Sequence, residues 1–142
     1  MQACNMQSIE PFSSQELYDV YFEGVNYILK NLYQDSGEYN NLVFDLMRGS
    51  KVFFLVNSPD KNASICVSPS GSIAIFFHKP LWEIMKKNQN IFAFVVFHEI
   101  SHRVVGADQN KADTLAFQIM QANGYNSVDP ELLQFIKIYA HR

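Results

Sequence analysis

Residues 98–102 read His-Glu-Ile-Ser-His, and their types and spacing fit metal-assisted hydrolysis. On a helix, His98 and His102 lie one turn apart, so both imidazoles leave the same face and can reach one zinc ion at about 2.0–2.1 Å. Glu99 then lies beside the ion without having to bind it. A carboxylate in that place can take a proton from water and pass it to a leaving amine. The spacing therefore predicts His98 and His102 as metal ligands and Glu99 as the catalytic general base and acid.

The segment around this motif predicts a buried helix over about residues 89–105. Its stretch from Ile91 to Phe97 is apolar on every side, which is typical of a helix without a solvent-facing stripe. Gly106 follows as a natural C-cap. A motif near the end of such a helix is held rigidly by its surroundings.

The motif in this context resembles that of the zincin metallopeptidases. Their extended pattern has Val or Thr three residues before the first His and an apolar residue two after the second, and Val95 and Val104 match. Arg103 departs from it, because that place is usually uncharged. The resemblance covers about residues 72–125. It implies a zinc-dependent enzyme that hydrolyses peptide bonds in a protein or peptide substrate.

A catalytic zinc usually takes three protein ligands and one water, and two aspartates compete for the third place. Asp108 lies six residues after His102, where metzincins place their third ligand, although their glycine would stand at position 105 and not at Gly106. Asp113 lies in a stretch that resembles the second helix of gluzincins, such as the small ImmA-type peptidases. That helix often reads Glu-x-x-Ala-Asp, in which the Glu binds zinc and the Asp orients a ligand His.

Gln109 stands at the Glu position of that pattern, and a neutral amide is a poor zinc ligand. Either Asp113 orients a histidine in a weak ligand set, or Asp113 has itself become the ligand. In a helical hairpin that turns near residues 107–108, Asp113 lies level with His102 while Gln109 stays in the turn. This geometry favours Asp113 as third ligand, with Asp108 as the alternative. Their competing structural roles are a solvated acid for Asp113 and a helix N-cap for Asp108.

The elements that must position these residues predict one α+β domain over residues 1–142. Helices are expected over about residues 14–33, 89–105 and 110–123, with a last one opening at Pro130, and three short strands within about 51–78. Tight turns between the strands predict an antiparallel sheet, packed on the buried motif helix, with further helices on both sides in sequence. This is the plan of a small zincin-like domain.

Two further roles follow from the resemblance. The strand over residues 72–78 would be the edge that pairs with the substrate backbone. A side chain that donates to the oxyanion is also usual in zincins. Tyr125 and His78 are the candidates, and Tyr139 and His141 are less favoured ones. None of the four has a motif around it, so a structural role is the simpler interpretation of each.

Composition limits the partners. The chain has 142 residues, a net charge of −3 and scattered Lys and Arg, so nothing indicates nucleic acid or a membrane surface. The first residues lack the pattern of a secretory signal, and two cysteines, Cys4 and Cys66, make no disulfide framework. A cytoplasmic location is expected, and a virion-associated protein would share these features.

Two other functions compete with the peptidase. One is a non-catalytic, zinc-stabilised module, such as a structural or regulatory protein of a phage or mobile element that keeps the zincin fold. Gln109 is its best support. The other is a site for a different metal, or one that hydrolyses small-molecule amides. A chain this short has little room for a deep specificity pocket, which suits a partner-recognised substrate or a place in a larger assembly.

Overall fold

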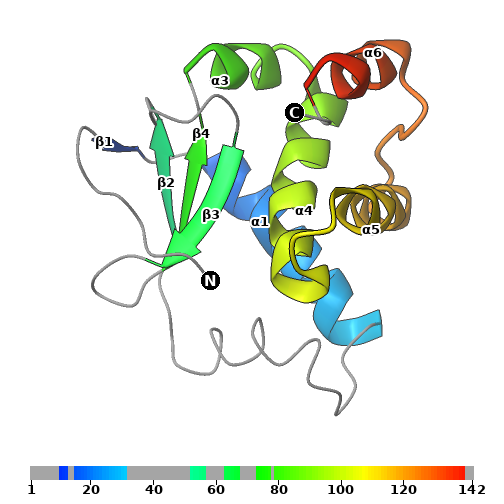
Figure 1. Ribbon diagram of the computed structural model, residues 1–142, viewed down its shortest axis with the longest axis horizontal. Coiled ribbons are helices and arrows are strands. Elements are labelled where there is room, and N and C mark those ends of the chain that lie inside the picture. The colour runs from blue at the N-terminus through cyan, green and yellow to red at the C-terminus, as the bar shows by residue number, and fades with distance from the viewer. Residues whose placement is uncertain are drawn as a thin grey trace.

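The computed structural model describes residues 10–12, 15–31, 52–56, 63–67, 73–77 and 79–139, with side chains for residues 15–31 and 80–138 (Figure 1). The helices of this part are α1 (Gln15–Asn31), α3 (Lys79–Met85), α4 (Gln89–Val105), α5 (Gln109–Ala122) and α6 (Pro130–Tyr139). The predicted helices are confirmed, and α4 has the bounds expected for the motif helix. None of the described helices is both long and apolar enough to cross a membrane.

Helix α4 is the centre of the helical part, and α1, α3, α5 and α6 all contact it (Figure 1). Residues 91–97 are buried without exception, as their apolar character predicts. The helix begins where the Asn88 side chain accepts hydrogen bonds from the backbone of Asn90 and Ile91, at 2.8 and 3.1 Å. It ends at Gly106, whose N–H donates to the carbonyl of His102. Both ends of the motif helix are therefore fixed.

The N-terminal helix α1 packs closely on α4 at Gly24. A Cβ atom added to Gly24 would lie 2.9 Å from Cδ1 of Phe97 and 3.0 Å from Cδ1 of Ile100. The missing side chain thus lets the two helices approach each other. Phe97 and Ile100 leave α4 on a different face from His98, so α1 supports the helix from behind the motif.

Local caps also define α5 and α6. Asp108 accepts a hydrogen bond from the backbone nitrogen of Lys111 at 3.0 Å and opens α5. Asp129 accepts one from the nitrogen of Glu131 at 3.0 Å and caps α6, which begins at Pro130 as predicted. Its other oxygen accepts from the amides of Asn88 and Asn90, at 3.1 and 2.9 Å. The start of α6 is therefore tied to the start of α4.

Four short strands are described by their backbone alone: β1 (Glu10–Phe12), β2 (Val52–Val56), β3 (Ala63–Val67) and β4 (Ile73–Phe77). Their order is β1-β2-β4-β3, with β2 parallel to β4 and β3 antiparallel to it. This differs from the predicted meander, and β4 pairs on both sides rather than forming an edge. Turn residues between strands reveal strand ends but not which strands pair. The predicted α+β class is confirmed in its helical part. Of the described strands β3 contacts α4, and the zincin-like plan of the sheet stays a prediction.

Candidate metal centre

The two histidines of the motif meet at their Nε2 atoms. The spacing of one helical turn brings His98 Nε2 within 3.0 Å of His102 Nε2, with the rings nearly perpendicular at 88°. Both side chains are partly buried, and Phe94 packs against the His98 ring with centroids 5.6 Å apart. The expected common face for the two imidazoles is therefore observed in the described residues.

The opposite ring nitrogens each face an oxygen that can only accept. His98 Nδ1 lies 2.8 Å from Oδ1 of Asp113, an ion-pair contact, and His102 Nδ1 lies 2.7 Å from the carbonyl oxygen of Gly106. An imidazole nitrogen that faces such an oxygen carries the proton of the ring. In a neutral imidazole the lone pair then lies on Nε2.

Gln109, the first residue of α5, adds a third polar atom to the two Nε2 nitrogens. Its Oε1 lies 2.9 Å from Nε2 of His98, and its side chain also acts on the pKa of His102. Two ring nitrogens and one amide oxygen therefore meet, and which of them donates depends on the tautomers of the two rings. When both rings are neutral and protonated at Nδ1, all three atoms are acceptors, an arrangement that suits a cation.

The electrostatics agree with a proton in the metal-free centre. Burial lowers the pKa of His98, but the contact with Asp113 and the charge of Glu99 outweigh burial and raise its pKa overall. Burial lowers the pKa of His102, with the Gly106 carbonyl acting against it. Of the two rings, His98 is therefore the one that takes up a second proton more readily, and a metal ion would compete with that proton.

The spacing of the three atoms fits a zinc ion. Two ligands of a tetrahedral zinc, each at about 2.0–2.1 Å, lie about 3.3 Å apart. The observed separations of 3.0 and 2.9 Å need only a small outward movement to reach that value. No three His, Cys, Asp or Glu side chains converge among the described residues, because the third converging group is an amide.

Glu99 is the buried carboxylate next to this centre. It is 5% exposed, and its Oε2 makes no hydrogen bond within the described part of the chain. Burial raises the pKa of Glu99 to about 7, against the opposing influence of His98. A carboxyl group in this state can both accept and donate a proton near neutrality.

The contacts of the two candidate aspartates differ from those expected of a metal ligand. Asp113 is buried and touches His98 on the nitrogen that faces away from His102 and Gln109. Asp108 caps α5, the structural role weighed for it from the sequence. This arrangement differs from the predicted one because Gln109 already belongs to α5 and not to the turn. Asp113, one turn further, therefore reaches the outer side of His98 instead of lying level with His102.

Of the candidate oxyanion donors, the structure describes the side chain of Tyr125, and its hydroxyl bonds to helix α1. The hydroxyl of Tyr125 donates to Glu23 of α1 at 2.9 Å, and its ring packs edge-on against Phe97. Burial, together with this bond to Glu23, raises the pKa of Tyr125. His78, His141 and the side chain of Tyr139 lie outside the described residues.

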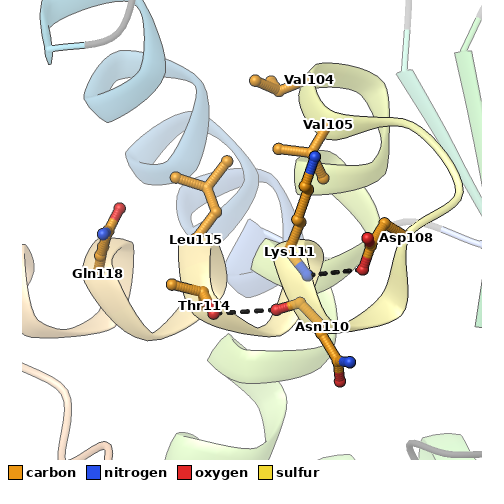
Figure 2. A pocket seen from close by; sticks show the side chains of 8 residues that line it. All are labelled: Val104, Val105, Asp108, Asn110, Lys111, Thr114, Leu115 and Gln118. Atoms are coloured by element: carbon orange, nitrogen blue, oxygen red, sulfur yellow. Dashed lines mark hydrogen bonds between the residues drawn. The ribbon is translucent and has the colours of Figure 1, made fainter.

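A shallow cavity of about 370 Å³ opens where α4 ends and α5 begins, and of the predicted site residues only Asp108 lines it (Figure 2). Its lining residues are Val104, Val105, Asp108, Asn110, Lys111, Thr114, Leu115 and Gln118. The cavity therefore lies on another face of the hairpin than the histidine pair. The centre itself lies at the exposed side chain of Gln109.

Comparisons with known proteins add no relative to this picture. No family model, curated protein or solved structure matches the chain.

Gln109 is the residue of the centre that the sequence did not predict as a ligand. Its position in the Gln-x-x-Ala-Asp stretch indicated a ligand, but it was not predicted as one because an amide is a weak zinc ligand.

Proposed function

We propose that the chain is a zinc-dependent peptidase in which His98, His102 and Gln109 hold the ion. The observation that carries the proposal is the convergence of three acceptor atoms at 2.9 and 3.0 Å, beside a buried carboxylate. In this proposal Asp113 is not a ligand. Its Oδ1 lies against Nδ1 of His98, which favours a proton on that nitrogen and keeps the Nε2 lone pair pointing at the ion, as outer partners of ligand histidines do.

The protein's own groups divide the chemistry between them. When bound, zinc would act as a Lewis acid toward a peptide carbonyl and a water molecule. Glu99 accepts the proton of the attacking water at Oε2 and then donates it to the leaving amine. Its burial keeps competing water away, and among the described residues that oxygen makes no other hydrogen bond. The Asp113 and Gly106 oxygens hold the two rings in place throughout.

The sheet suggests how a peptide would be held. Among the described strands, β3 is an edge and also contacts α4, whereas β4 is internal. An extended peptide added to β3 would be bound through main-chain hydrogen bonds, with little demand on its sequence. We therefore assign to β3 the substrate-pairing role that the sequence had suggested for residues 72–78.

The competing function is a non-catalytic zinc module, and Gln109 supports it. An all-neutral ligand set binds zinc more weakly than one with a carboxylate. The buried Oε2 of Glu99 favours the enzyme, because a purely structural site has no need of an unpaired buried carboxylate.

The test compares wild type with Glu99→Gln and with Glu83→Gln, an exposed carboxylate of α3. Protein purified without added metal is analysed for metal content, and cleavage of casein and of unstructured peptides is followed. We expect zinc in all three proteins and loss of cleavage by about 10²–10⁴-fold only in Glu99→Gln. Zinc-loaded wild type that cleaves nothing would favour the module. Iron or nickel in place of zinc would count against a peptidase.

A further inference from the structure

Gly106, which follows the last residue of α4, has a backbone conformation that other residues rarely adopt. Its φ is 81° and its ψ is −152°, a region populated almost only by glycine. A Cβ atom at this position would meet nothing within 4 Å. Glycine is therefore required here for the direction of the backbone and not for space.

The backbone direction at Gly106 places its carbonyl oxygen beside a histidine of the centre. The carbonyl oxygen of Gly106 lies 2.7 Å from Nδ1 of His102, four residues earlier. His98 has the Asp113 carboxylate beside its Nδ1, whereas Nδ1 of His102 faces the Gly106 carbonyl. The glycine conformation thus supplies one of the two contacts that fix which ring nitrogens are free to bind a cation.

We propose that Gly106 is a positioning residue of the centre: its conformation aims its carbonyl at His102 Nδ1 and holds His102 in the Nδ1–H tautomer, with the Nε2 lone pair toward the metal. The inference rests on the proposed metal-binding function. A different residue at 106 would turn the carbonyl away, because side chains with a Cβ avoid this region. His102 would then also carry its proton on Nε2, and metal binding through that atom would be weaker because the proton must first move to Nδ1.

The first measurement uses the metal-free wild type. Imidazole ¹⁵N–¹H correlation spectra above neutral pH report which nitrogen carries the proton, with the His102 signals assigned from a His102→Gln variant. We expect the Nδ1–H tautomer for His102. The Nε2–H tautomer in the wild type would overturn the inference, whether or not the protein binds zinc.

The second measurement compares Gly106→Ala with Gly124→Ala. Gly124 follows α5, has the same φ of 81° and also has nothing within 4 Å of an added Cβ, so it controls for backbone strain away from the centre. We expect both variants to lose thermal stability, and only Gly106→Ala to bind zinc more weakly, by about 10–100-fold. Equal zinc affinity of Gly106→Ala and wild type would overturn the inference. If wild type binds no zinc, the proposed function fails and the tautomer spectrum alone decides the inference.

Discussion

Gln109 is the residue whose chemistry sets the strength of the proposed metal centre. Its amide oxygen lies 2.9 Å from His98 Nε2, where a carboxylate would add a negative charge to an otherwise neutral ligand set. We expect Gln109→Glu to tighten zinc binding by about tenfold or more, which is about 1.4 kcal/mol. Gln109→Ala should weaken it. Zinc affinities from competition with a chromophoric chelator test both, and unchanged affinity in both variants would remove Gln109 from the ligand set.

Asp113 and Asp108 have different tasks, and a pair of substitutions separates them. Asp113 holds His98 by its Nδ1, so Asp113→Asn should weaken zinc binding by about 10–100-fold. Asp108 caps α5, so Asp108→Ala should lower the free energy of unfolding by about 1 kcal/mol and leave zinc affinity unchanged. Zinc titrations and denaturant unfolding of both variants give the comparison. Loss of zinc in Asp108→Ala alone would restore Asp108 as the ligand.

At the scale of elements, the close approach of α1 to α4 depends on Gly24. Gly24→Val would force a branched side chain to within 2.9 Å of Phe97 and 3.0 Å of Ile100. We expect it to lower the free energy of unfolding by about 1–3 kcal/mol, the usual cost of overpacking. Asn26→Val, at an exposed position of the same helix, is the control and should change stability by about 0.5 kcal/mol or less. Similar losses of unfolding free energy in both variants would show that the close packing of α1 at Gly24 does not contribute to stability.

The junction between the starts of α4 and α6 should make stability depend on pH. Hydrogen bonds from Asn90 and Asn88 lower the pKa of Asp129 below its ordinary value of about 3.9. A pKa lowered in the folded state stabilises the fold at pH above the unfolded value, and this contribution is lost as pH falls through the folded pKa. We therefore expect Asp129→Asn to lower the thermal midpoint at neutral pH, and by less as the pH falls below about 4. A difference that is the same at every pH would contradict the assigned role.

Sequence patterns predicted the helices more fully than the contacts between them. Apolar periodicity, Asp129 before Pro130, and Gly106 after Val105 were enough to place the ends of α4 and α6, because caps act within a few residues. The histidine pair was predictable for the same reason, since its spacing is one helical turn. The contacts of His98 with Asp113 and Gln109 were not, because they depend on how α5 packs on α4. A shift of the α5 start by one residue moved Gln109 from the turn to the centre.

At the scale of the whole molecule, the apolar core of the described residues consists of side chains from all five described helices. Buried residues of α1, α3, α4, α5 and α6 form one cluster, and the histidine pair lies at its margin against the exposed Gln109. The proposed ligands come from α4 and α5, which pack on each other. A fold that forms without the ion would suit the proposed catalytic site, whereas a structural zinc site holds small elements together and depends on its metal.

This difference gives a prediction that separates the enzyme from the zinc-stabilised module. Metal-free protein should keep its helical circular dichroism at room temperature after treatment with a chelator, because the core does not need the ion. Zinc should still raise the thermal midpoint, since it binds only the folded state: at about 100 times its Kd it adds about 2.7 kcal/mol, which for a chain of this size is about 10 °C. The variant His98→Gln, with one ligand removed, should unfold at the metal-free midpoint whether or not zinc is present. If the chelator instead abolishes the helical signal of the wild type, the ion is part of the fold itself, and the module becomes the better description of the chain.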